Sequence, residues 1–360
     1  MSRRYDVAVI AGDGIGQEVV PAAITCLDVV AERHGYTVDW HAYPWGSTHF
    51  RQHGRMMPAD GIDQLRSHRA IFLGAVGDPE IPDAETLWGL LIPIRRHFDQ
   101  YVNLRPVRSL VSVPTRVVNA GDIDLVIVRE NVEGEYSTVG GRIYPGDARE
   151  AAVQQTIFTR IGVERVARFA GELAARRRGL VTSATKSNGI IHTMPFWDEV
   201  VGQTLREVPG VRLDKELVDA LAAKLVRDPA SFDVIVASNL FGDILSDLAG
   251  AAAGSIGIAP SANLNPERAF PSMFEPVHGS APDIAGQGVA NPIGQIWAGA
   301  LMLEHLGESA AAAELIAAFE ACLAAGVRTR DLGGTADTRE FTDAVVAHLR
   351  ALPAPLIASA

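Results

Sequence analysis

The chain has 360 residues, 48% of them hydrophobic and 21% charged, and a formal net charge of −11. This length suggests two domains, and the excess of acidic residues argues against a nucleic acid or an anionic membrane surface as a partner. Two cysteines provide no disulfide framework, and no uncharged apolar run reaches the roughly 18 residues of a membrane span, so we expect a soluble cytoplasmic protein.

Segments typical of strands and helices alternate along the chain. We expect strands at residues 5–12, 37–43, 70–76, 124–130, 179–185, 211–217 and 232–238, and helices at 18–33, 59–68, 84–97, 292–306 and 309–326. This alternation predicts an α/β protein with a largely parallel sheet. Residues 135–158 break the pattern, because Gly-Gly and Pro-Gly pairs stand between β-branched and aromatic residues there. That arrangement predicts an inserted hairpin or arm.

The turn after the first strand carries Gly12, Gly14 and Gly16. An ordinary dinucleotide-binding turn has its glycines in a G-x-G-x-x-G pattern, and Gln17 stands where the third glycine belongs. A turn that is merely tight has the same glycines. They therefore do not decide between a nucleotide site and a plain turn.

A long loop at residues 274–291 is more informative, because it combines glycine, proline and small residues with His278, Asp283 and Asn291. Loops of this length usually bind something. A carboxylate in such a loop can accept hydrogen bonds from ribose hydroxyls and repels a 2′-phosphate. A structural loop with a solvated Asp283 is the alternative for this segment alone.

Three arginines stand where helical or strand segments end, namely Arg95, Arg105 and Arg129. The guanidinium group is a planar fork that binds a carboxylate through two hydrogen bonds. In an acidic chain, three such arginines suggest a substrate with more than one carboxylate. For any one of them alone, an ordinary surface position is the simpler explanation.

Three other side chains are candidates for proton transfer or metal binding. Lys186 directly follows the strand at 179–185, where partial burial could lower its pKa and make it a general base. Tyr136 could donate a proton, although a tyrosine is more often simply packed. Asp219 precedes an apolar helical pattern, where the alternative is an aspartate that interacts with the helix dipole.

The stretch "ASNLFGDILSDLAG" carries Asp243 and Asp247 one helical turn apart. Leu240 and Ile244 belong to an apolar arc of this helix that we expect to be buried, with the aspartates along its edge. Two carboxylates beside a buried face need either protons or a cation. The histidines and cysteines have no zinc spacing, so with Asp219 as a third carboxylate the sequence favours Mg²⁺ or Mn²⁺.

Six stretches together resemble the β-decarboxylating 2-hydroxyacid dehydrogenases, the family of isocitrate and isopropylmalate dehydrogenases. They are "GDGIGQEV", "NLRPVR", "VRENVEGEY", "TKSNG", "SNLFGDILSD" and "FEPVHGSAPDIAG", and they run from residue 12 to about residue 291 in the order and spacing of that family. Within it, "LWGLLIPIRRHFDQYVNLRPVR", "EGEYSTVGGR" and "TSATKSNGI" most resemble the branch of tartrate and D-malate dehydrogenases.

The resemblance implies an isopropylmalate dehydrogenase-like two-domain α/β fold, which is not an ordinary Rossmann domain. The first domain would comprise residues 1–101 and 254–360. The second, residues 102–253, would carry the arm and the helices of an intertwined homodimer. Each active site would borrow side chains from the partner subunit.

The resemblance also assigns roles to residues. Arg95, Arg105 and Arg129 would bind the carboxylates of a small-molecule substrate, and Lys186 and Asp219 would come from the partner subunit. Lys186 would take the hydroxyl proton, and Tyr136 would protonate the product of decarboxylation. The remaining assignments are Mg²⁺ or Mn²⁺ at Asp219, Asp243 and Asp247, and NAD along His278, Gly279, Ala281, Asp283 and Asn291.

The segment before Arg95 is expected to meet the C3 substituent of the substrate. Trp88 there is typical of the tartrate/D-malate branch and leaves little room for a branched group, whereas the apolar Leu90 and Leu91 favour one. We therefore expect D-malate or tartrate as the substrate, with 3-isopropylmalate as the alternative. A non-catalytic regulatory subunit of the same fold is a second alternative, and a metal-binding structural protein would leave the arginines unexplained.

Overall fold

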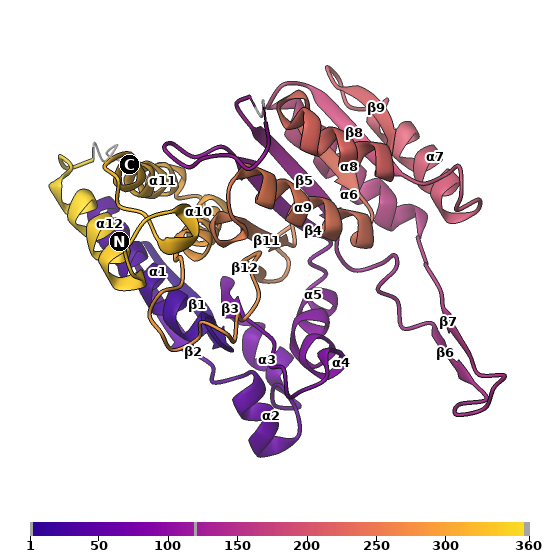
Figure 1. Cartoon of the computed structure of the whole chain (residues 1–360), viewed down its shortest axis with the longest axis horizontal. Helices are drawn as coiled ribbons and strands as arrows, with labels where there is room; N and C mark the ends of the chain where they lie inside the picture. The colour runs from indigo at the N-terminus through magenta and orange to yellow at the C-terminus, as the bar shows by residue number, and fades with distance from the viewer. Residues whose placement is uncertain (1–2, 119–120, 356–360) are drawn as a thin grey trace. The chain divides into compact units, whose positions relative to one another are not determined.

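The computed structural model describes residues 3–118 and 121–355, which form two compact units. Unit 1 comprises residues 1–100, 109–116 and 253–360, and unit 2 comprises 101–108 and 117–252. Each unit has strands covered by helices (Figure 1). Within the described ranges, no helix has both the length and the apolar character needed to cross a bilayer.

Unit 1 contains five neighbouring strands in the order β2-β1-β3-β12-β11. Their bounds are β1 (Arg3–Gly12), β2 (Tyr36–Ala42), β3 (Ala70–Ala75), β11 (Pro260–Leu264) and β12 (Ser272–Pro276). All neighbouring pairs are parallel except β11 and β12. All six residues of β3 are buried, as is typical of a parallel strand with helices on both faces.

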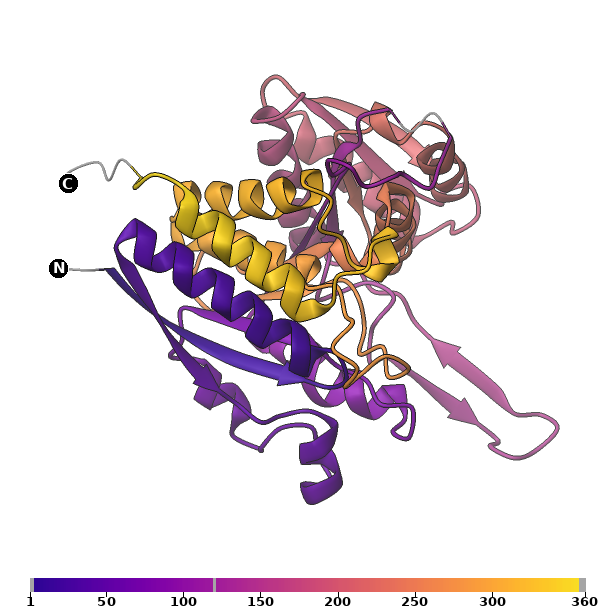
Figure 2. The same cartoon turned by 60° about the vertical axis from the view of Figure 1, so that its left-hand side comes forward.

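The helices of unit 1 cover these strands. They are α1 (Gly16–His34), α2 (Ser47–His53), α3 (Gly61–Leu65), α4 (Asp83–Thr86), α5 (Ile92–His97), α10 (Ile293–Leu306), α11 (Ser309–Ala324) and α12 (Thr338–Ala351), with the single turns η3 (Ile256–Ile258) and η4 (Arg330–Leu332). α1 and α12 lie side by side (Figure 2). A π-helical turn, η1 (Leu87–Leu91), joins α4 to α5.

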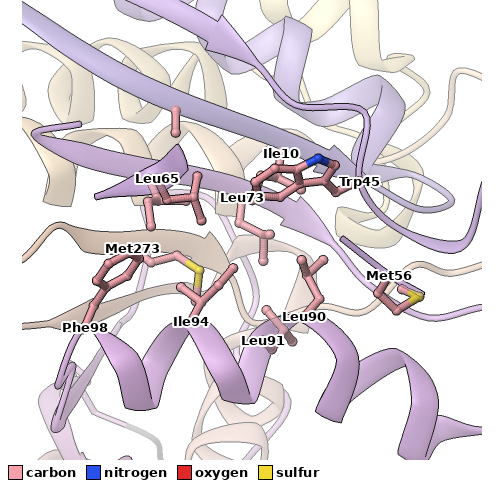
Figure 3. Packing of buried hydrophobic residues seen from close by; sticks show 12 residues of the cluster. Ile10, Trp45, Met56, Leu65, Leu73, Leu90, Leu91, Ile94, Phe98 and Met273 are labelled. Carbon is pink, nitrogen blue, oxygen red and sulfur yellow. The ribbon is translucent and has the colours of Figure 1, made fainter. Parts of the chain in front are cut away.

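One hydrophobic core of unit 1 lies between the strands and the segment η1–α5 (Figure 3). Leu73 and Met273 project from β3 and β12, and Leu90 and Ile94 meet them from the helical side. All four side chains are fully buried. The segment that precedes Arg95 is therefore fixed by core packing.

Unit 2 contains a second set of five strands in the order β4-β5-β10-β8-β9. Its elements are β4 (Val102–Arg108), β5 (Asp124–Glu130), β8 (Leu180–Thr185), β9 (Arg212–Leu217), β10 (Val234–Ala237), α6 (Arg160–Ala175), α7 (Thr193–Leu205), α8 (Val218–Arg227), η2 (Pro229–Ser231) and α9 (Asn239–Ala253). β4 is antiparallel to β5, and the other pairs are parallel.

A separate hairpin of β6 (Gly140–Ile143) and β7 (Ala151–Gln154) projects from unit 2 (Figures 1 and 2). Every residue of its two strands is exposed. It carries the exposed apolar side chains of Val139, Ile143, Tyr144 and Val153. The hairpin expected within residues 135–158 is confirmed.

The expected α/β class is confirmed, and a strand is found at each of the seven expected places. Three further strands, β4, β11 and β12, were not expected. β4 contains Arg105, Pro106 and Arg108, which interrupt the apolar pattern that would indicate a strand. β12 overlaps the start of the segment that was interpreted as a loop. That loop begins after Pro276.

The expected buried arc of α9 is wrong. Leu240 and Ile244 are exposed in the single chain, whereas Phe241, Leu245 and Ala249 face the core. Both stripes of this helix are apolar, so the residue pattern alone does not identify the one that packs on the strands. α9 thus presents its second apolar stripe at the surface of unit 2.

Candidate active site

A cluster of charged side chains lies in unit 2 between β4, β5 and α9. Arg129, at the carboxyl end of β5, forms an ion pair with Asp243 through Nη1. Arg105, on β4, lies 3.2 Å from the same Asp243 oxygen and 3.5 Å from Asp247 Oδ1. Two buried arginines therefore meet both aspartates of α9.

Neutral side chains fix the orientation of the two arginines. Asn239 Oδ1 accepts hydrogen bonds from Arg129 Nε at 3.1 Å and Nη2 at 2.7 Å. Asn103 Oδ1 and Ser246 Oγ accept from Arg105 at 2.7 and 2.6 Å. Because their donors are held by these partners, the guanidinium groups are preorganised toward the aspartates.

Gly242 and Tyr136 complete the surroundings of Arg129. A Cβ atom at Gly242 would lie 2.6 Å from the Cβ of Arg129, so α9 needs a glycine there to approach β5. The Tyr136 hydroxyl donates a hydrogen bond to Asp243 Oδ2 at 3.0 Å, and its ring lies 5.6 Å from the Arg129 guanidinium carbon. The predicted proton donor is thus in contact with a predicted metal ligand.

Asp243 and Asp247 offer carboxylate oxygens, the donors that Mg²⁺ and Mn²⁺ prefer. Burial raises the pKa of Asp247, with Asp243 adding to the rise and Arg105 opposing it. Their charges are balanced here by the two arginines. Within residues 3–118 and 121–355, no three histidine, cysteine, aspartate or glutamate side chains come close enough to hold a metal.

Lys186 and the third predicted ligand, Asp219, form a separate pair. Lys186 follows the last residue of β8, and its Nζ lies 2.8 Å from Asp219 Oδ1. Asp219 stands in the first turn of α8, and the hydrogen bond from Lys186 lowers its pKa. Lys186 and Asp219 therefore form a pair within one chain, apart from the cluster around Asp243 and Asp247.

Arg95 is the only predicted substrate arginine in unit 1. Its Nη2 donates to Glu275 Oε1 at 2.7 Å, and Asn263 Nδ2 donates to the same oxygen at 2.7 Å. Sequence reasoning missed Glu275. The signal for it was a glutamate inside an otherwise apolar segment, directly before the motif "PVHGS".

The five predicted residues of the nucleotide loop differ in exposure, backbone conformation and hydrogen bonding. Asp283 is exposed, and Gly279 has open space where a side chain would stand. Ala281 has a positive φ of 40°. His278 Nε2 is buried without a hydrogen-bond partner among the described residues, whereas the amide of Asn291 is engaged by Asp331 and by the start of α10.

The glycine turn after β1 contacts this loop. Gly14 has a φ of +52°, and a Cβ there would lie 2.0 Å from the carbonyl oxygen of Ser280. The neighbouring Asp13 is buried and accepts from Ser47 N at 2.7 Å, Ser47 Oγ at 2.8 Å and Gly77 N at 3.0 Å. Asp13 is a second residue that sequence reasoning missed, because its partners are distant in the chain.

The segment expected to meet the C3 substituent forms the π-helical turn η1. Trp88 is partly exposed, and the Arg96 guanidinium carbon lies 5.0 Å from the centre of its ring. Leu90 and Leu91 belong to the core cluster, with Leu90 fully buried. Of these three residues, Trp88 has the most accessible side chain.

Comparisons with known proteins agree on one family. The family model described as isocitrate/isopropylmalate dehydrogenase matches residues 6–345. The chain is 53% identical to the probable tartrate dehydrogenase/decarboxylase of Bacillus subtilis (strain 168) over 97% of this chain and 99% of the relative. It is 51% identical to the decarboxylating D-malate dehydrogenase of Escherichia coli (strain K12), over 96% and 98%.

A solved structure is similar over nearly the whole chain. It is the crystal structure of isocitrate dehydrogenase from Methylococcus capsulatus, with 34% sequence identity and a TM-score of 0.88. The alignment covers 96% of this chain and 99% of that one. The similarity therefore includes the elements of both units.

Proposed function

This chain belongs to the isocitrate/isopropylmalate dehydrogenase family, and on that premise we propose that it oxidises and decarboxylates a small 2-hydroxy diacid, D-malate or tartrate. One observation carries the proposal: Arg105 and Arg129 are buried against Asp243 and Asp247 on α9. This cluster offers cations for substrate carboxylates and carboxylates for a metal. The names of the two relatives support a decarboxylating dehydrogenase.

The two buried arginines would bind the substrate by exchanging partners. In the chain alone they neutralise Asp243 and Asp247. A diacid brings carboxylates that compete for the same guanidinium groups, and a divalent cation competes for the aspartates. A diacid that takes the arginines leaves the aspartates without cations, and a cation that takes the aspartates leaves the arginines without anions. The diacid and the cation should therefore bind together.

Asp243 and Asp247 of one chain, with Asp219 of a second chain, would hold Mg²⁺ or Mn²⁺. When bound, the metal supplies Lewis-acid stabilisation of the negative charge that develops on the substrate oxygen. The chain's own contribution is to orient Asp243 and Asp247 beside Arg105 and Arg129. Their hard oxygen donors fit such an ion.

Proton transfer would be divided between two residues. Lys186, with its Nζ beside Asp219, would take the proton of the substrate hydroxyl as hydride leaves C2. After the bond to the departing carboxylate breaks and CO₂ leaves, Tyr136 would deliver a proton to the carbon atom. The hydrogen bond from Tyr136 to Asp243 supports this role, because it directs the phenol hydroxyl at the cluster.

NAD⁺ would be the hydride acceptor, bound along the loop that contains His278, Gly279, Ala281, Asp283 and Asn291. Asp283 is exposed, so it is accessible to ribose hydroxyls and would repel the 2′-phosphate of NADP⁺. Asn291 would act indirectly, because its amide already connects the loop to Asp331 and α10.

Residues of a second copy would complete each active site in a homodimer. Three observations support this assembly. The β6–β7 hairpin has exposed apolar residues, and α9 has an exposed apolar stripe with Leu240 and Ile244. Lys186 and Asp219 are separated from the other predicted metal ligands. A cytoplasmic location is consistent with two free, buried cysteines.

Steady-state rates with NAD⁺ and Mn²⁺ test the proposed activity. D-malate should yield NADH, CO₂ and pyruvate in equal amounts, and tartrate should also be oxidised. We expect 3-isopropylmalate to be poorer, since Trp88 restricts the space for a branched C3 group. A kcat/KM for 3-isopropylmalate well above that for D-malate would assign the chain to leucine biosynthesis instead.

A further inference from the structure

A cavity of about 230 Å³ opens in unit 1 where β3 and β12 begin, and none of the predicted site residues lines it. Its charged wall is formed by Arg66, Arg69 and Arg268. His305, in the last turn of α10, contributes from another side. The 14 residues of α10 separate this cavity from the predicted nucleotide loop by about 20 Å.

The positive charge of this cavity is poorly compensated. In the described part of the chain, the guanidinium groups of Arg69 and Arg268 have neither an ion pair nor a hydrogen bond. Arg66 forms one exposed ion pair, in which its Nη2 lies 3.7 Å from Asp63 Oδ1. Its guanidinium carbon lies 5.6 Å from the centre of the Phe270 ring. In a chain with a net charge of −11, three arginines that line one cavity and have only one carboxylate among the described residues in contact with them need an explanation.

The loop that carries Arg268 is organised by hydrogen bonds. Asn265 is buried, and its Oδ1 accepts from the backbone N–H groups of Ala269 at 2.8 Å and Phe270 at 3.1 Å. Arg268 has a φ of 57°, which is costly for a residue with a side chain. Because glycine would avoid this strain, an arginine at this position suggests that its guanidinium group has a use.

Two histidines line the cavity, and His305 can add a neutral donor to it. Burial lowers the pKa of His305 to about 4, with Arg268 and Arg69 contributing, so the ring is neutral at pH 7. His68 is buried, with Nε2 2.8 Å from the Tyr43 hydroxyl and Nδ1 without a partner among the described residues. Neutral imidazole can donate one hydrogen bond without adding charge.

We propose that this cavity binds a small oxyanion with two negative charges, held by Arg66, Arg69 and Arg268. Guanidinium groups bind phosphate and carboxylate oxygens through paired hydrogen bonds. The volume is below that of sites for drug-sized ligands, so the ligand has the size of phosphate, a small phosphate monoester or a short dicarboxylate. The site differs from the proposed active site in both its residues and its place in unit 1.

The test follows the Cε1–H NMR signal of His305 in the full chain, assigned with His305→Gln. Inorganic phosphate is titrated at constant ionic strength, with chloride as the balancing salt. We expect a saturable shift with a Kd below about 10 mM, because several charge-assisted hydrogen bonds form at once. Titration with succinate in a parallel experiment distinguishes a phosphate ligand from a dicarboxylate.

Arg268→Gly is the decisive variant, because glycine suits a φ of 57° and the loop should keep its fold. It should weaken binding at least tenfold, and Arg69→Gln should do the same. Arg339→Ala is the matched control, since Arg339 is exposed on α12 beside Asp343, outside this cavity. No saturable shift with either anion, or equal affinity in Arg268→Gly and wild type, would overturn the proposal.

Discussion

The charged cluster of unit 2 has buried functional side chains, whereas the predicted nucleotide loop of unit 1 has an exposed one. In the cluster, Arg105 and Arg129 are buried and fixed by side-chain hydrogen bonds. In the loop, Asp283 is exposed, and its backbone oxygen accepts a hydrogen bond from Gln287. Removal of a buried arginine of the cluster should therefore impair both folding and turnover, whereas changes in the loop should alter cofactor choice alone.

The largest effect is expected for Arg129→Gln. It leaves Asp243 with Arg105 as its remaining cationic partner, and because the Asp243 side chain is 33% exposed the loss should be smaller than the cost of about 3–5 kcal/mol for a fully buried pair. We expect kcat/KM for D-malate to fall by about a thousandfold and Tm to fall with it. Arg142→Gln, in the exposed pair with Glu150 on the β6–β7 hairpin, is the control and should leave the Tm of the chain unchanged.

Asp247→Asn should separate turnover from stability within the same cluster. The change removes a proposed metal ligand and also relieves the repulsion between Asp247 and Asp243. We expect metal-dependent turnover to be abolished, while Tm without metal stays the same or rises. Wild-type turnover at limiting Mn²⁺ would show that Asp247 is not a ligand.

Asp283→Lys tests the contrasting behaviour of the loop. The new ammonium group can attract the 2′-phosphate that the carboxylate repels, so the preference for NAD⁺ over NADP⁺ should narrow or reverse. Because the side chain is exposed, Tm should change little. Equal efficiency of the wild type with both cofactors would contradict the proposed role of Asp283.

The smallest effect on turnover is expected at Glu130, the residue after Arg129. Burial raises its pKa to about 7, above the usual value of about 4.3, although backbone N–H groups of Val132 and Glu133 oppose the rise. The folded chain therefore keeps a proton that the unfolded chain loses, and stability falls as the pH rises from about 4 to about 7. Glu130→Gln should flatten this part of the pH–Tm curve and be more stable than wild type at pH 8.

The sequence predicted strands with continuous apolar runs and the exposed hairpin with its turn residues, but it missed the buried strands β11 and β12. Continuous apolar runs identify β3 and β5 because both faces of a parallel strand are covered. β4 was not predicted because Arg105 and Pro106 interrupt the apolar pattern of a strand. It forms a strand by pairing with β5. The buried stripe of α9 was misassigned because both stripes are apolar and only the tertiary structure distinguishes them.

The candidate site was predictable as a set of residues but not as a set of contacts. Residue type and motif were enough to select Arg129 and Asp243, yet nothing local indicates that they pair, because 114 positions separate them. The same holds for Asp13 with Gly77 and for Arg95 with Glu275. Buried partners of this kind depend on the packing of strands that are distant in sequence.

The exchange of partners in the charged cluster is tested most directly by the affinity for Mn²⁺ with and without D-malate. NAD⁺ is omitted so that no turnover occurs. If D-malate takes the arginines from Asp243 and Asp247, the Kd for Mn²⁺ should fall at least tenfold, a coupling of about 1.4 kcal/mol, and Mn²⁺ should tighten D-malate binding by the same factor. The same Mn²⁺ affinity with and without D-malate would contradict the account.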